Sequence, residues 1–176
     1  MQKILSLLLL SFALTPIFVQ AQRKVTTYFL AQYNNTIKDV TLGNNPWGMG
    51  LGVQSFLNNK TKFKPTIELT GDIYLADDKV FRTDSTGTPF NEVGGMTNLF
   101  IGSSFHPTKN IYGSFVAGPS LLGGQTLFGI KPTFGFFFSN KQRITGKLSY
   151  INIFNRGEII KEDFTSWSIA LGVKLF

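Results

Sequence analysis

The chain has 176 residues, of which 15% are charged and 14% are aromatic, with 18 Phe among them. Soluble domains average about 25% charged residues, and a chain this apolar and aromatic is not expected to be disordered. The sequence has no Cys and one His, and its formal net charge is +7. These counts exclude disulfides, thiolate metal sites, a Cys nucleophile and a site built from several His. Asp77, Asp78 and Asp84 could hold a calcium ion through oxygen ligands, but they lack the spacing of a known site, and we expect no cofactor and no metal ion.

Residues 1–21 have the layout of a secretory signal peptide. Met1-Gln2-Lys3 is a short positive start, Ile4 to Val19 is almost wholly apolar, and Val19-Gln20-Ala21 resembles a cleavage site. The alternative is a transmembrane helix, but the apolar run contains Pro16 and is shorter than the roughly 20 residues that a span needs. We expect cleavage after Ala21, which leaves one domain, 22–176, with a charge of +6 once Lys3 is lost.

The rest of the chain alternates apolar and polar residues, which predicts β-strands. From Phe63 to Leu75, for example, the odd positions are mostly apolar, whereas the even ones include Lys64, Glu68 and Asp72. The predicted strands, in chain order, are Val25–Tyr33, Trp47–Leu57, Phe63–Leu75, Met96–Phe105, Ile111–Leu121, Phe128–Phe138, Arg143–Phe154 and Ser166–Leu175. An even number of strands of about 9–12 residues is what a barrel needs to cross a bilayer.

The connections between these strands alternate in length. Short polar connections fall at 58–62, 106–110 and 139–142, and long ones at 34–46, 76–92 and 155–163. The tight Gly-Gly turn within 122–125 is the exception. Membrane barrels have short periplasmic turns and longer outer loops, so we expect the short connections and both termini to be periplasmic.

Alternation alone does not say which face meets water. A soluble barrel or sandwich buries its apolar face, whereas a membrane barrel turns it outward. The aromatic residues Tyr33, Trp47, Tyr150 and Trp167 lie near strand ends, as an interfacial girdle requires. The polar faces are rich in Gly, Ser and Thr, which suits a narrow interior. We therefore predict an all-β, eight-stranded antiparallel up-and-down transmembrane β-barrel, preceded by a cleaved signal peptide.

With these features the chain resembles the small outer-membrane β-barrels of the OmpX or OmpA transmembrane-domain type. The resemblance implies a porin-like protein of the Gram-negative cell envelope, surrounded by outer-membrane lipid and lipopolysaccharide. It also implies insertion by the barrel-assembly machinery, which would recognise the terminal Phe176. The outward series from Trp167 to Leu175 is one residue out of phase with Phe176. A β-bulge near the end would restore the phase.

Several charged residues lie on the polar faces assigned to the barrel interior. They are Lys64, Glu68, Asp72, Lys131, Arg143, Lys147 and Lys174. Side chains fill the lumen of an eight-stranded barrel, and an isolated buried charge costs several kcal/mol. We therefore expect the two carboxylates to pair with some of the basic residues in a closed, non-conducting barrel. The alternative is that some basic head groups reach the barrel mouths and are hydrated. Because the positive charge is spread over turns, lumen and N-terminus, we expect no nucleic-acid partner.

The sequence contains little that could carry catalysis, and we predict no catalytic residues. Gly48-Met49-Gly50-Leu51-Gly52 resembles a dinucleotide loop, but no helix pattern follows it; alternate glycines on the lumen face explain it better. Small lipid A deacylases of the outer membrane use Ser, His and a carboxylate. Ser104 and His106 are two residues apart, but no carboxylate lies near them in the sequence.

The connection 76–92 is the candidate contact surface, because loops on a rigid scaffold often bind partners. Val80, Phe81 and Phe90 are apolar residues in this otherwise polar segment. They could meet an extracellular protein or lipopolysaccharide, or pack on the barrel rim. The predicted function is a structural or surface-interaction role in the outer membrane. The alternatives are a secreted or periplasmic soluble β-barrel that binds a small apolar ligand, and a lipid A-modifying enzyme.

Overall fold

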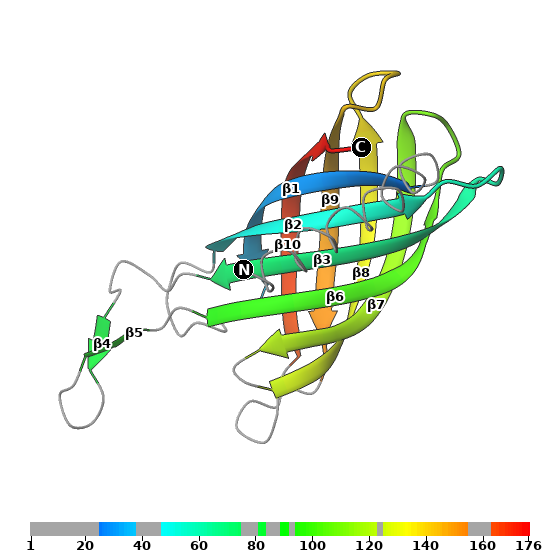
Figure 1. Ribbon diagram of the computed structural model, residues 1–176. Coiled ribbons are helices and arrows are strands. Elements are labelled where there is room, and N and C mark those ends of the chain that lie inside the picture. The colour runs from blue at the N-terminus through cyan, green and yellow to red at the C-terminus, as the bar shows by residue number, and fades with distance from the viewer. Residues whose placement is uncertain are drawn as a thin grey trace, which may run out of the picture.

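The alternating segments form strands that close into an antiparallel barrel in the computed structural model of the protein (Figure 1). The structure describes residues 25–37, 47–74, 81–83, 89–91, 94–122, 125–154 and 163–176. The expected signal peptide, 1–21, lies outside the described residues. Within the described ranges, no helix has the length and apolar character needed to cross a membrane.

Eight strands make up the barrel wall. They are β1 (Val25–Thr36), β2 (Trp47–Leu57), β3 (Phe63–Tyr74), β6 (Gly94–Phe105), β7 (Ile111–Leu122), β8 (Gln125–Phe137), β9 (Ile144–Ile153) and β10 (Phe164–Lys174). Each strand pairs antiparallel with the next one in this order, and β10 closes the barrel against β1. The predicted eight-stranded up-and-down barrel is therefore confirmed, with strand bounds within three residues of those expected from the sequence.

The strands are staggered as well as paired. A row of paired residues that starts at Thr27 passes through every strand and returns to β1 at Ile37. Such a stagger makes the strands tilt relative to the barrel axis, and they cross the wall obliquely in Figure 1. Side chains from distant parts of the chain therefore meet at one level of the lumen.

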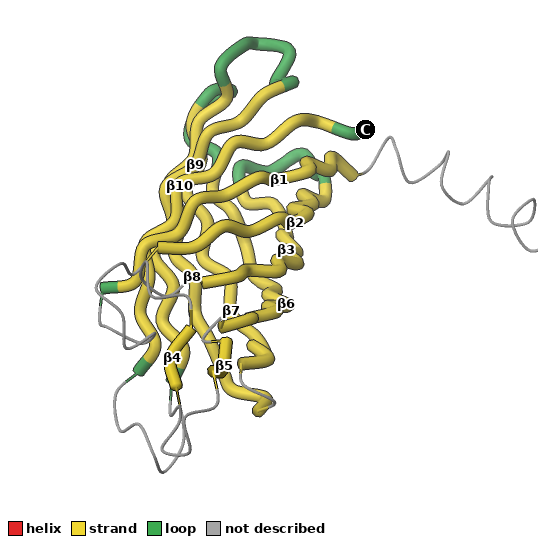
Figure 2. The backbone as a smooth tube through the Cα atoms, turned by 90° about the vertical axis from the view of Figure 1, so that its left-hand side faces the viewer, coloured by secondary structure: helices red, strands yellow, loops and turns green. Residues whose placement is uncertain are grey.

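A second, two-stranded sheet lies beyond the barrel wall. It consists of β4 (Phe81–Thr83) and β5 (Pro89–Asn91), which pair antiparallel within the connection from β3 to β6 (Figures 1 and 2). The sequence pattern predicted no strands in 76–92, and this prediction was wrong. Three-residue strands are too short to show a period of two.

The two ends of the barrel differ in their connections. The short-turn end carries the connections 58–62, 106–110 and 138–143, together with the C-terminus (Figure 2). The long-connection end carries the segments that join β1 to β2, β3 to β6 and β9 to β10. It also carries the tight turn from β7 to β8, where Leu122 pairs with Gln125.

Glycines make room on the lumen face where a side chain approaches from the neighbouring strand. A β-carbon added to Gly50 would lie 2.0 Å from Oδ1 of Asp72, and one added to Gly135 would lie 2.1 Å from Cζ of Tyr112. In each case the glycine is paired directly with the residue whose side chain covers it. The structure thus places the alternating glycines of β2 where the sequence analysis expected them, without a phosphate-binding loop.

Candidate functional site

The outer wall of the barrel is apolar and exposed. Along residues 65–74 of β3, 95–101 of β6 and 166–173 of β10, buried and exposed residues alternate, and most of the exposed ones are large apolar side chains. Ile101 and Ile169, for example, are each 61% exposed. Soluble monomers rarely expose a contiguous apolar patch larger than a few hundred Å². A wall that is apolar on every strand is the arrangement expected for a barrel surrounded by lipid.

The residues predicted to form an aromatic girdle lie together at the long-connection end. Tyr33 of β1 stacks on Trp47 of β2 with ring centroids 6.4 Å apart, and Tyr150 of β9 meets the edge of Trp167 of β10 at 5.2 Å. These four strands are consecutive in the wall. The structure therefore places all four residues at one end of the barrel, over one part of its circumference.

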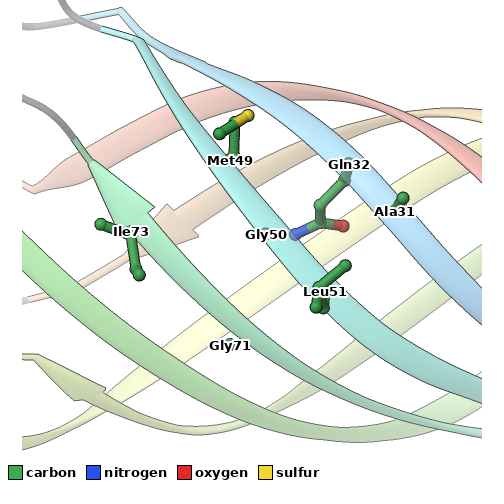
Figure 3. A pocket seen from close by; sticks show the side chains of 7 residues that line it. All are labelled: Ala31, Gln32, Met49, Gly50, Leu51, Gly71 and Ile73. Atoms are coloured by element: carbon green, nitrogen blue, oxygen red, sulfur yellow. The ribbon is translucent and has the colours of Figure 1, made fainter.

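A hollow in the outer wall lies over two small residues, Ala31 and Gly71 (Figure 3). Larger side chains of Met49, Leu51 and Ile73 border it, and its volume is about 530 Å³. All five residues are exposed on the outside of the wall. The difference in side-chain size accounts for the hollow, and we assign no ligand to it.

Inside the barrel, one carboxylate holds two lysines. Nζ of Lys131 lies 2.6 Å from Oε1 of Glu68, and Nζ of Lys147 lies 2.7 Å from Oε2. Gln54 donates to the same Oε2 at 3.1 Å, and all four side chains are buried. Because β3 carries Glu68 while β8 and β9 carry the lysines, the ion pairs link strands that are not neighbours in the wall. They therefore fill the lumen from one side to the other.

The second buried carboxylate, Asp72, is held by neutral donors. Asn34 donates to Oδ1 at 2.7 Å, and Asn98 donates to Oδ2 at 3.1 Å. Gln32 and the hydroxyl of Thr70 donate to the same carboxylate. In the described part of the chain, no basic side chain forms an ion pair with Asp72. With Glu68, Lys131 and Lys147, it makes a set of two buried negative and two buried positive groups whose formal charges cancel.

Apolar layers lie on both sides of these charges. Toward the short-turn end the layer comprises Tyr28, Leu30, Phe56, Tyr112 and Phe137, and His106 stacks on two of its rings. Toward the long-connection end the layer comprises Tyr74, Met96, Phe100, Val116, Ile151, Ile153 and Phe164. The lumen is thus an ion cluster between two packed apolar layers.

The structure differs from the expected interior network at three of its seven positions. Arg143, which precedes β9, and Lys174, the last residue of β10, are exposed, and Lys64 is only half-buried. All three lie at the short-turn end, beyond the layer of aromatic rings, where a long side chain reaches water. The structure brings together Glu68 with Lys131 and Lys147, and it holds Asp72 separately.

The sequence analysis missed the amides that complete the lumen. Gln32, Asn34, Gln54 and Asn98 are buried and donate to Asp72 or Glu68. A signal was present for Gln54, which lies on the glycine-rich polar face of Trp47–Leu57. Asn34 lies outside the predicted strand Val25–Tyr33, and the alternation around Gln32 and Asn98 is weak. The predicted interior network included charged residues only and therefore did not include these amides.

Ser104 and His106 do meet, but without a third group. Oγ of Ser104 lies 2.9 Å from Nε2 of His106, and Thr66 donates to the same hydroxyl at 3.0 Å. Both residues are buried at the short-turn end. Burial and, secondarily, the charge of Lys64 lower the pKa of His106 to about 4. Among the described residues, no carboxylate is bonded to this imidazole, and no three His, Cys, Asp or Glu side chains form a potential metal site.

The chain ends in a β-bulge. Leu175 donates its N–H to the carbonyl of Thr27 at 2.8 Å, and the N–H of Thr27 donates to the carbonyl of Phe176 at 3.0 Å. Two residues of one strand thus face a single residue of its partner, which defines a bulge. Leu175 and Phe176 are both exposed, at 55% and 43%. The bulge allows two consecutive apolar side chains to be exposed at the rim.

The residues proposed for outer contacts are only partly covered by the structure. Val80 lies outside the described residues. Phe81 belongs to β4 and Phe90 to β5, where Phe90 pairs with Arg82. The hairpin of β4 and β5 provides the backbone frame for this candidate surface.

No family model matches the sequence, and no curated protein matches it. Solved structures of the Yersinia pestis outer-membrane protein Ail do match the fold. Ail in a phospholipid bilayer nanodisc has a TM-score of 0.54 at 9% identity, covering 85% of this chain and 99% of Ail. The crystal structure of Ail, the attachment invasion locus protein, has a TM-score of 0.52 at 9% identity, covering 86% and 98%. The crystal structure of Ail in complex with the heparin analogue sucrose octasulfate has a TM-score of 0.51 at 11% identity, covering 86% of this chain and 97% of Ail.

The likeness is one of fold. This chain has the closed eight-stranded antiparallel architecture of a small outer-membrane β-barrel.

Proposed function

We propose that the chain is an integral protein of the Gram-negative outer membrane, of the OmpX or OmpA transmembrane-domain type. Residues 22–176 would form the mature barrel after removal of residues 1–21, with both termini and the short turns in the periplasm. The observation that carries this proposal is the inversion of the usual core. Large apolar side chains cover the outside of the wall, and the buried charges lie inside it. Lipid is the surrounding that such a wall requires.

A closed barrel of this kind would act as a scaffold rather than as a channel. The ion cluster of Glu68, Lys131 and Lys147 spans the lumen, and packed side chains lie on both sides of it. Planar-bilayer recording tests this role. We expect no stable unitary conductance, and large, stable conductance steps would overturn it.

The two alternative functions need features that the geometry does not supply. A soluble barrel that binds an apolar ligand has a polar outside and an apolar cavity, the opposite of this distribution. A lipid A-modifying enzyme needs its nucleophile within reach of lipid, whereas Ser104 is buried beneath the short-turn end. Lipid analysis of cells carrying His106→Ala tests the second alternative: we expect an unchanged acyl pattern, and an altered one would revive catalysis.

A surface-interaction role rests on the segments outside the wall. The β4–β5 hairpin lies in the connection 76–92 (Figure 1), and we propose that this connection meets an extracellular partner or lipopolysaccharide through Val80, Phe81 and Phe90. Ail has been solved with a heparin analogue, which supports looking for contacts outside the membrane. The exposed rim at Phe176 is our candidate for recognition by the barrel-assembly machinery.

Fractionation tests the proposal as a whole. We expect the full chain in the outer membrane, with a band that migrates differently on SDS gels before and after heating. Recovery in a detergent-free periplasmic extract would overturn the proposed function.

A further inference from the structure

The short-turn end of the barrel is uniformly basic. Six basic side chains are exposed there: Lys60, Lys62, Lys109, Lys141, Arg143 and Lys174. The segments 56–66, 104–112, 136–146 and 172–176, which form this end, contain no Asp or Glu. The three long connections at the opposite end sum to a formal charge of −3. The two ends therefore differ in sign.

Two pairs of phenylalanine rings lie on the outside of the wall at the same end as these cations. The rings of Phe63 and Phe105 are 4.9 Å apart, and those of Phe136 and Phe138 are 4.8 Å apart. All four are exposed on the outside of the wall, and Lys62 is adjacent in sequence to Phe63. Tyr and Trp can hydrogen-bond at an interface. The four predicted girdle residues, Tyr33, Trp47, Tyr150 and Trp167, lie instead at the long-connection end.

This order of groups matches a phospholipid leaflet. Apolar rings contact acyl chains, and lysines beyond them extend their stems along apolar surface while the ammonium groups reach the phosphates. Basic residues near an anionic lipid surface are attracted to it, and each additional one strengthens the attraction. Hydration alone would not require that Asp and Glu side chains be absent from these segments.

We propose that the short-turn end binds the headgroups of anionic phospholipids in the leaflet on its side of the membrane. The inference rests on the proposed function, because it requires the barrel to be inserted in a bilayer. It also explains the location of six of the 16 basic residues in 22–176. The basic side chains lie at the short-turn end, next to the apolar outer wall, where lipid phosphates would lie.

Spin-labelled lipids provide the test. The full mature chain is placed in phosphatidylcholine vesicles, and electron paramagnetic resonance compares how strongly spin-labelled phosphatidylglycerol and phosphatidylcholine associate with it. We expect phosphatidylglycerol to be preferred about threefold or more at low salt, and the preference to weaken as salt screens the charges. In the variant Lys60→Gln, Lys62→Gln, Lys109→Gln, Lys141→Gln, which keeps Arg143 and Lys174, the preference should fall by half or more.

A matched control removes four charges from the other end. The variant Lys38→Gln, Lys79→Gln, Arg82→Gln, Lys161→Gln changes only the long connections and should keep the preference. No preference in the unaltered chain, or equal losses in both variants, would overturn this inference. Heat-modifiable migration separates the two proposals: a chain that fails to insert contradicts the proposed function, whereas an inserted chain without lipid preference contradicts only this inference.

Discussion

Replacing the central carboxylate tests whether the lumen depends on charge compensation. In Glu68→Gln the side chain keeps its size but loses its charge, and Lys131 and Lys147 lose their common partner. Both ammonium groups are buried and lie within 2.7 Å of that carboxylate. Removing one partner of a buried pair costs about 3–5 kcal/mol, because it leaves an uncompensated charge. With two cations affected, we expect the free energy of unfolding to fall by about 4 kcal/mol or more.

Removing the whole cluster should be far milder. A buried ion cluster that is replaced by apolar residues of similar volume often leaves stability unchanged. We therefore expect the quadruple variant Glu68→Leu, Asp72→Asn, Lys131→Met, Lys147→Met, which removes all four of these buried charges, to unfold within about 2 kcal/mol of the unaltered chain. Lys174→Met is the matched control, because this lysine is exposed and its replacement should change stability by less than about 0.5 kcal/mol.

Guanidinium unfolding in phospholipid vesicles, followed by the fluorescence of Trp47 and Trp167, measures these differences. For slopes of about 2–6 kcal/mol per molar, Glu68→Gln should lower the unfolding midpoint by about 1 M. Two results would refute the reasoning. One is a stability of Glu68→Gln within about 1 kcal/mol of the unaltered chain. The other is a quadruple variant as unstable as the single one. The first result would mean that the charges are hydrated, and the second that lost packing or hydrogen bonds, rather than uncompensated charge, set the cost.

Two further predictions follow from the lumen and its short-turn end. Gly135→Ala should lower the free energy of unfolding by about 1–3 kcal/mol, because its β-carbon would overlap the Tyr112 ring. Gly71→Ala should be near neutral, because no atom lies within 4 Å of the new carbon. Equal unfolding midpoints of the two variants in guanidinium would contradict the close approach of Gly135 and Tyr112. NMR titration should find His106 neutral down to about pH 4, because burial and the charge of Lys64 lower its pKa. The unfolded chain takes up this proton near pH 6.5, so the free energy of unfolding should fall as the pH drops from about 6.5 to 4. A measured pKa near 6.5 would contradict this and show an imidazole open to water.

Much of the wall could be read from the sequence, because alternation is a local property. Side chains in a strand point to opposite sides in turn, so Glu68 and Asp72 were assigned to one face of β3 without knowledge of any partner. Sequence reasoning also predicted the strand number, because each strand is a separate alternating run bounded by polar turns. It did not find β4 and β5, whose three-residue length shows no periodicity.

Pairing within the lumen depends on the stagger of eight strands, which no single segment specifies. The tertiary structure decided that Glu68 meets Lys131 and Lys147, whereas Asp72 is bound by amides. It also decided that Lys174 lies at the mouth, although its position in the alternation matches the buried residues of β10.

The end of the chain shows the same division. From the sequence alone, Phe176 is out of phase with its strand, and a bulge is only one possible remedy. The hydrogen bonds of Thr27 to both Leu175 and Phe176 show that the bulge is present. The sequence by itself determined which residues share a face, because that depends on neighbours along the chain. Only the closed barrel decided which side chains from different strands meet, because register and tilt are properties of all eight strands together.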